Sequence, residues 1–247
     1  MRLLVLIHRP LDRPLPLPGL LVCSPGGRRI ETARSADTKK GKLRDYAIPI
    51  EWNYGAFPQT WEQPDHAWAG MPISDSHPSR FTPLTDQLST PSLEMIGLEA
   101  LASKGDNDPL DLVDLSESRV ECGSIIEVKP LAVLAMIDEG EVDWKVVCVN
   151  AADPKAALIN SLDDVETHFP GQIARVREWF TWYKAVDGAP GDGPLGSNKK
   201  EDAEPNIFGF DGEAKDATKA MQVVEETHAS WKALKDGVVA PEGLALE

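Results

Sequence analysis

Short runs of apolar and β-branched residues occupy the middle of the chain and predict β-strands. Acidic and glycine-bearing turns separate these runs, which cover residues 110–115, 124–128, 131–137 and 143–149. Sequential short strands of this kind are typical of a small antiparallel barrel. The pattern therefore predicts a barrel in the middle of the chain.

Two stretches that follow the strands have the spacing of amphipathic helices. In the first, residues 161–164 resemble a helix cap, and Ile173, Val176 and Phe180 recur at helical intervals. The second covers residues 217–234, and its apolar side carries Met221, Val224, Thr227, Trp231 and Leu234. We expect helices to pack on the barrel and form one α+β domain.

Other segments lack a regular period. Residues 1–37 contain five prolines and scattered arginines, so only residues 3–7 are a candidate strand, and we expect this segment to lie outside the core. Residues 65–103 are rich in Ser, Pro and Thr and predict a surface insertion, with a short helix over 92–103. Residues 187–205 predict a loop.

Composition excludes several classes of protein. The chain has 247 residues, of which 42% are hydrophobic and 26% charged, so it is neither disordered nor fibrous. No apolar run approaches the ~20 residues that cross a bilayer, which excludes an integral membrane protein. The three cysteines lack C-x-x-C spacing, so neither a disulfide framework nor a zinc site is predicted.

Charge is distributed unevenly along the chain. Residues 1–44 contain ten Lys plus Arg and three acids, a net of +7, and the remainder contains 15 against 37, a net of −22, which together give −15. With this negative charge, the part of the chain after residue 44 is expected to repel nucleic acid and anionic membranes, and to attract divalent metal ions.

An acidic motif at residues 105–111 is the clearest candidate for chemistry. Asp106 and Asp108 can point to one side of an extended chain, and a turn at Pro109 can bring Asp111 beside them. Carboxylates so close repel one another unless a cation lies between them, which favours a hard divalent metal ion. A solvated acidic turn is the alternative. A calcium-binding EF-hand is excluded, because Leu110 and Asp111 occupy positions that need a ligand and a glycine.

A second charged motif covers residues 138–145. Gly140 permits a tight hairpin, after which Asp143 and Lys145 share one face of the outgoing strand. An ammonium beside carboxylates suits a ligand that carries both anionic oxygens and bound metal. The alternative is a charged hairpin tip with no function.

These motifs, in their order, closely resemble the soluble inorganic pyrophosphatases of eukaryotes, and most of all the fungal ones. The resemblance covers most of residues 37–235. It rests on the segments 37–44, 53–62, 105–111, 134–145, 169–171, 178–180, 183–184 and 210–215.

The resemblance implies a five-stranded, OB-like antiparallel barrel with flanking helices, and hydrolysis of pyrophosphate to two phosphates with Mg²⁺. It also implies a homodimer, usually cytoplasmic; an Arg-rich start makes a mitochondrial protein the alternative. Asp108 would hold the attacking water and accept its proton. The other implied site residues are the metal ligands Asp106, Asp111, Asp138 and Asp143, the supporting acid Glu141, the phosphate-binding Arg44, Lys145, Tyr183 and Lys184, and the supporting Tyr54.

The chain departs from the family at three places. The family carries two glutamates and a lysine on strands that precede residue 37, but residues 1–36 contain only Glu31 and no lysine. Ile50 stands where the family has a tyrosine, in a stretch that is shortened. Residues 65–103 replace a short link. The N-terminal strands of the barrel are therefore expected to be incomplete.

Two interpretations follow from these departures. One is an active pyrophosphatase, and the other is a catalytically impaired protein that binds metal and phosphate. The chain is also consistent with an imperfect conceptual translation of such a gene or with a diverged paralogue. We expect an irregular segment over 1–36, a pyrophosphatase-like domain over 37–235 with insertions at 65–103 and 189–204, and a tail over 236–247.

Overall fold

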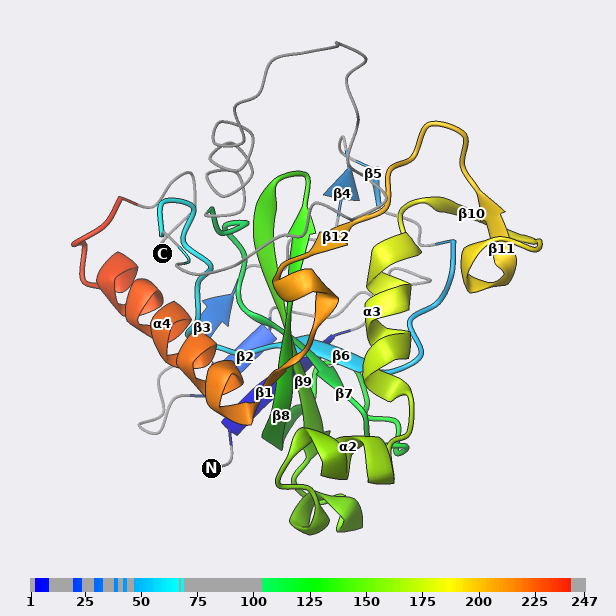
Figure 1. Ribbon diagram of the computed structural model, residues 1–247. Coiled ribbons are helices and arrows are strands. Elements are labelled where there is room, and N and C mark those ends of the chain that lie inside the picture. Colours follow the sequence, from blue (N-terminus) through cyan, green and yellow to red (C-terminus); the bar gives the residue numbers. More distant parts are fainter. Residues whose placement is uncertain are drawn as a thin grey trace, which may run out of the picture.

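Five strands that pair in a closed ring form the centre of the fold (Figure 1). They follow the order β1, β6, β7, β9, β8, and β8 pairs again with β1. Their bounds are β1 Leu3–His8, β6 Asn53–Ala56, β7 Asp111–Asp114, β8 Ile125–Asp138 and β9 Glu141–Asn150. The predicted five-stranded, OB-like barrel is confirmed. One of its five pairings, β7 with β9, is parallel rather than antiparallel. β9 turns back beside β8 and enters the ring between β7 and β8, so it runs in the direction of β7.

The computed structural model describes residues 3–8, 20–23, 29–32, 38–39, 42–43, 47–66, 68 and 104–240. The short strands outside the ring are β2 Leu20–Cys23, β3 Arg29–Thr32, β4 Thr38–Lys39, β5 Lys42–Leu43, β10 Val186–Pro190, β11 Ser197–Lys199, β12 Ile207–Phe208 and β13 Lys215–Asp216. Within the described ranges, no helix is long and apolar enough to cross a membrane.

β8 is one long strand where the sequence predicts two. Its register with β9 shifts between Pro130 and Ala132. Proline has no N–H to donate to a sheet, so such an irregularity is the usual way for a strand to accommodate it. Pro130 interrupts the run of apolar residues in the sequence, but the strand continues through it.

The hairpin between β8 and β9 has a two-residue turn. Asp138 pairs with Glu141, and the two residues between them, Glu139 and Gly140, have φ angles of 52° and 92°. Two successive left-handed residues match the type I′ turn, whose twist suits antiparallel strands. The tight hairpin predicted at Gly140 is therefore confirmed.

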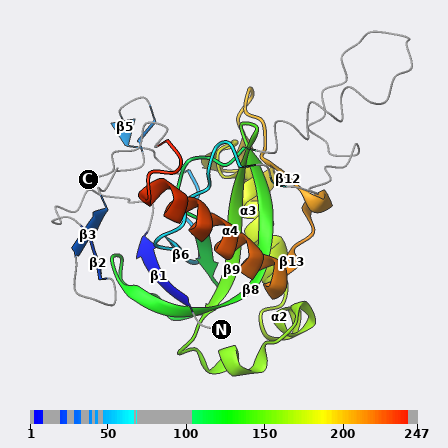
Figure 2. The ribbon, with the colours of Figure 1, turned by 90° about the vertical axis from the view of Figure 1, so that its left-hand side faces the viewer.

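In the part of the chain that the structure describes, α-helices flank the ring at α2 Leu162–His168, α3 Gln172–Trp182 and α4 Ala217–Lys235. Figure 1 shows α3 and α4 on opposite sides of β8 and β9, and Figure 2 shows α4 lying across them. The predicted helix at 217–234 is confirmed. In place of the first predicted helix, the structure has two helices, α2 and α3. They are separated because Gly171 has a left-handed φ of 70° and caps the start of α3. Ser161 caps α2 by accepting a hydrogen bond from the Asp164 N–H.

Of the two predictions about irregular segments, one is corrected by the structure and the other cannot be compared with it. Residues 187–205 contain the β10–β11 hairpin instead of a plain loop. The helix predicted over 92–103 falls outside the described residues. The described residues also contain short 3₁₀ helices at Pro154–Leu158, Pro194–Gly196 and Phe210–Gly212.

The core consists of two apolar clusters on the two faces of the strands. One cluster fills the ring and continues to α4; it includes Val5, Ile7, Leu112, Val146 and Val223. The other packs α2 and α3 on the opposite face of β8 and β9; it includes Met136, Val147, Val165, Val176 and Phe180. The alternation of side chains along each strand places every second residue in one cluster or the other.

The N-terminal strand β1 contributes to the core, which corrects the expectation that residues 1–37 lie outside it. Val5 and Ile7 are fully buried inside the ring, with an exposure of 0%. β1 pairs with β6 through Leu6, Ile7 and His8 and with β8 through residues 3–6. The chain thus closes its barrel with a strand of its own that lacks the glutamates and lysine of the family.

Replacing Ile7 with valine tests this placement of β1. Removal of one buried methylene is expected to lower the free energy of unfolding by about 0.5–1.5 kcal/mol, measured by urea denaturation. Leu4, on the same strand but 59% exposed, provides the control. Leu4→Val should change stability by less than about 0.5 kcal/mol. Equal effects of the two changes would contradict the burial of β1 in the ring.

Candidate active site

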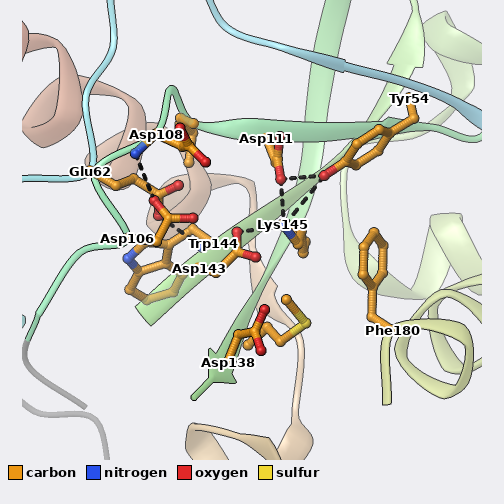
Figure 3. Close-up of polar contacts among 12 residues, drawn as sticks. Tyr54, Glu62, Asp106, Asp108, Asp111, Asp138, Asp143, Trp144, Lys145 and Phe180 are labelled. Carbon is orange, nitrogen blue, oxygen red and sulfur yellow. Dashed lines mark hydrogen bonds and ion pairs between the residues drawn. The ribbon is translucent and has the colours of Figure 1, made fainter. Parts of the chain in front are cut away.

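A group of acidic side chains and one lysine lies at the start of β7, the end of β8, the first half of β9 and the loop that precedes β7 (Figure 3). β6 supplies Tyr54, β7 begins with Asp111, and β8 ends with Asp138. β9 supplies Asp143 and Lys145. The structure therefore brings together residues from both acidic motifs that the sequence singled out.

Strand alternation explains how β9 presents its charged residues. Trp144 points into the ring, where it belongs to the cluster with Val146. Asp143 and Lys145, one residue to either side, point to the opposite face. The prediction that these two residues share a face is confirmed by their ion pair.

Lys145 is the centre of the hydrogen-bonded group. Its ammonium donates to the carboxylates of Asp111 and Asp143, and it lies 3.4 Å from the Tyr54 hydroxyl. The side chain is only 2% exposed, and its Nζ lies 5.1 Å from the centre of the Phe180 ring. Burial alone would lower the pKa of Lys145, but the two carboxylates raise it well above its usual value. Lys145 is therefore held as a cation.

Tyr54 and Asp111 form the side of the group that faces α3. The Tyr54 hydroxyl donates a hydrogen bond to Asp111, and the tyrosine ring lies 5.9 Å from that of Phe180. Burial, together with the charge of Asp111, raises the pKa of Tyr54 well above its usual value. The tyrosine consequently stays protonated and acts as a fixed donor to Asp111.

A second acidic group lies on the other side of Asp143. Oxygen atoms of Glu62, Asp106 and Asp143 all lie within 4.8 Å of one another. Burial and the charge of Asp143 raise the pKa of Asp106 well above its usual value. Burial raises the pKa of Asp143 to about 7, against the opposing effect of Lys145. Three oxygen donors this close are suited to a hard divalent cation.

Asp108 differs from its acidic neighbours because it is exposed. Its backbone N–H donates to Asp106 Oδ1 over 3.0 Å, and its carbonyl oxygen accepts from the Glu62 N–H over 2.9 Å. The main chain is thus fixed, while the residue as a whole is exposed to solvent. This arrangement suits a group that must exchange a proton with water.

Lys184 and Tyr183, which follow α3, approach the tip of the β8–β9 hairpin. The Lys184 ammonium donates to Asp138. The Tyr183 ring stacks on Trp179, with centroids 4.7 Å apart. The two cations, Lys145 and Lys184, therefore border the acidic group on the side of α3.

Three other residues singled out in the sequence lie outside this hydrogen-bonded group or outside the described residues. Arg44 lies outside the described residues. Glu141 is exposed at the start of β9 and takes no part in the hydrogen bonds described above. Ile50 packs against the apolar cluster around α3.

Sequence reasoning gave no role to Glu62 or Phe180. Glu62 ends the aromatic stretch 53–62. A charged residue at the end of such a stretch is the sequence feature that could have indicated a role for it. Phe180 lies on the apolar face of a predicted helix, and nothing in its spacing distinguishes a core residue from one that lies beneath a lysine.

Comparison with known proteins places this site in a family. The family model described as inorganic pyrophosphatase matches residues 36–208, which include every residue of the group. The chain belongs to the inorganic pyrophosphatase family. The resemblance noted in the sequence is thereby confirmed, for fungal members and for plant and algal ones.

Individual relatives cover most of this chain. Soluble inorganic pyrophosphatase 1, chloroplastic, of Chlamydomonas reinhardtii is 40% identical over 204 residues, which are 83% of this chain and 57% of that protein. Inorganic pyrophosphatase of Neurospora crassa is 38% identical over 214 residues, 85% of this chain and 59% of that protein. The chain therefore spans little more than half the length of these relatives.

Solved structures of pyrophosphatases share the fold. The recombinant inorganic pyrophosphatase of Trypanosoma brucei brucei has a TM-score of 0.61 and 34% identity, covering 82% of this chain and 47% of that one. The type I inorganic pyrophosphatase of Toxoplasma gondii has a TM-score of 0.61 and 30% identity, covering 94% of this chain and 79% of that one. The barrel with flanking helices is thus the fold of the family.

The raised pKa of Asp143 predicts how stability depends on pH without metal. Its ordinary value is 3.8, and its folded value is about 7. Between these pH values the folded chain holds a proton that the unfolded chain releases, so this contribution falls as pH rises, by at most about 1.4 kcal/mol per pH unit.

Thermal unfolding in EDTA from pH 4.5 to 7.5 measures this effect. Because other acids also titrate, the quantity of interest is the difference between the wild type and Asp143→Asn. The wild type should lose stability relative to the variant as pH rises. Parallel pH profiles for the two proteins would rule out the raised pKa.

Proposed function

We propose that this chain hydrolyses inorganic pyrophosphate to two phosphates with the aid of Mg²⁺. The observation that carries the proposal is that a chain of the pyrophosphatase family places Asp106, Asp108, Asp111 and Asp143 beside Lys145 in one group. The relatives named above are called inorganic pyrophosphatases, and the proposal extends that activity to this chain. A catalytically impaired binder is less well supported, since the acidic residues are retained together.

The residues present fit divalent metal ions. Carboxylate oxygens are the ligands that Mg²⁺ prefers, and both Glu62 Oε2 and Asp138 Oδ1 are buried without a hydrogen-bond partner. Asp106, Asp111, Asp138 and Asp143 would hold the metal, with Glu141 as a supporting acid. Bound Mg²⁺ would lower the pKa of a water molecule and neutralise charge on the phosphates.

The other residues of the group would act on the attacking water and on the phosphates. Asp108, exposed beside the buried acids, would orient the attacking water and accept its proton. Lys145, Lys184, Tyr183 and Arg44 would bind phosphate oxygens and stabilise the charge on the departing phosphate. Tyr54 would hold Asp111 in place through its hydroxyl. No covalent intermediate with the chain is required.

Phosphate release from pyrophosphate by the full chain, with and without Mg²⁺, tests the proposed function. We expect release that depends on Mg²⁺. No release from a chain that is folded by circular dichroism would favour the impaired binder instead.

Further expectations concern assembly and location. The homodimer and the cytoplasmic location, or the mitochondrial alternative, stay predictions from the resemblance. Two of the relatives are named as chloroplastic, so membership of the family does not by itself fix the compartment. The absence of nucleic-acid and membrane partners stays a prediction from the acidic charge. The division into 1–36, 37–235 and 236–247, with insertions at 65–103 and 189–204, also stays a prediction.

A further inference from the structure

Glu62 is a buried carboxylate beside the acidic residues, and the proposed mechanism gives it no role. Its exposure is 0%. Oε1 accepts a hydrogen bond from the Trp144 N–H over 2.9 Å, whereas Oε2 is buried without a hydrogen-bond partner. Burying a carboxylate oxygen without a hydrogen-bond partner costs free energy of folding. This oxygen therefore indicates a ligand that the protein chain does not supply.

The main chain around Glu62 is fixed to the loop that carries Asp106. The Asn107 N–H donates to the Glu62 carbonyl oxygen over 3.0 Å, and the Glu62 N–H donates to the Asp108 carbonyl oxygen over 2.9 Å. Gly105 is required here, because a Cβ at this position would overlap the Glu62 carbonyl group. The two loops are locked together, so the Glu62 side chain has one defined position relative to Asp106.

That position directs the Glu62 carboxylate toward two other carboxylates (Figure 3). Its ligand oxygen lies within 4.8 Å of those of Asp106 and Asp143. Among the described residues, no ion pair joins Glu62 or Asp106 to a lysine or arginine. Carboxylates this close to one another repel when they are buried together. A bound cation would remove this repulsion.

We propose that Glu62 is a ligand of a divalent metal ion held together with Asp106 and Asp143. The site lies on the side of Asp143 away from Lys145, whose ammonium bonds Asp143 and Asp111. The inference rests on the metal dependence in the proposed function, and it adds a protein ligand from the loop that follows β6. The alternative is that Glu62 only accepts the Trp144 hydrogen bond.

Binding of Mn²⁺ to the full chain in the absence of pyrophosphate separates these roles. Glu62→Gln keeps an oxygen for the Trp144 N–H but removes the charge. Measured by isothermal titration calorimetry, the variant should bind Mn²⁺ at least about tenfold more weakly at its tightest site. KCl in the buffer screens long-range charge effects, so a surviving difference reports local binding. Glu225→Gln, on the exposed side of α4, is the matched control and should bind Mn²⁺ as the wild type does.

Thermal unfolding without metal gives a second readout. Glu62→Gln should be at least as stable as the wild type, because it removes a buried carboxylate that faces two others. Bound Mn²⁺ should then raise its melting temperature less than it raises that of the wild type. Mn²⁺ affinity within about twofold of the wild type, or a metal-free variant that is less stable than the wild type, would overturn the proposal.

The result is independent of pyrophosphate hydrolysis. If the wild type releases no phosphate but Glu62→Gln loses Mn²⁺ affinity, the metal ligand stands and the proposed function fails. If the wild type hydrolyses pyrophosphate while Glu62→Gln binds Mn²⁺ normally, the proposed function stands and this inference fails.

Discussion

Replacing Asp108 with asparagine is expected to reduce phosphate release from pyrophosphate by about 10²- to 10⁴-fold, the usual contribution of a general base. The amide cannot accept the proton of the attacking water. The fold should remain intact, because Asp108 is exposed and asparagine has nearly the same shape and keeps the main-chain hydrogen bonds to Asp106 and Glu62. Steady-state phosphate release at saturating Mg²⁺ measures the effect.

Two controls make the Asp108 result specific. Circular dichroism and the melting temperature should match those of the wild type. Asp192→Asn, in the exposed turn between β10 and β11, should leave the rate unchanged. Wild-type turnover in Asp108→Asn would exclude Asp108 as the residue that accepts the proton.

Replacing Lys145 with methionine is expected to lower the free energy of unfolding in metal-free buffer by about 3–5 kcal/mol. Methionine retains much of the apolar length of lysine over the Phe180 ring, but it leaves the buried Asp143 and the half-buried Asp111 without their cation. Urea denaturation in EDTA measures the loss. Added Mg²⁺ should recover part of it, because the same carboxylates can then bind the metal.

The control for Lys145 is a lysine whose ion pair lies in solvent. Lys232 pairs with Asp236 one helical turn away on α4, and its side chain is 63% exposed. Lys232→Met should change stability by less than about 1 kcal/mol. A similarly small loss in Lys145→Met would mean that the buried carboxylates do not depend on the lysine.

Much of the site could be predicted because its residues lie in short motifs with simple geometry. Two-residue periodicity was enough to place Asp143 and Lys145 on one face, and a glycine between acids was enough to locate the hairpin turn. The spacing of Asp106, Asp108 and Asp111 indicated a common direction. Local sequence contains this information because neighbouring residues on a strand have fixed relative orientations.

Contacts between distant segments could not be predicted in the same way. Glu62 and Trp144 are 82 residues apart, and their hydrogen bond depends on how two loops are locked together by Gly105. The strand β1 was a candidate from its apolar run, but its partners β6 and β8 depend on the whole ring. Hydrophobic periodicity can therefore predict that a segment is a strand, but it cannot predict with which other strands that segment pairs.

Strand β1 also constrains the order of events in folding. It precedes the other strands of the ring along the chain, yet one of its partners begins at Ile125, so pairing with β8 must join segments more than 100 residues apart. Contacts so distant in sequence slow folding, and until β1 docks, the edges of β6 and β8 remain open to other chains. We therefore expect the yield of refolded protein to fall as protein concentration rises, with aggregates built through these edges.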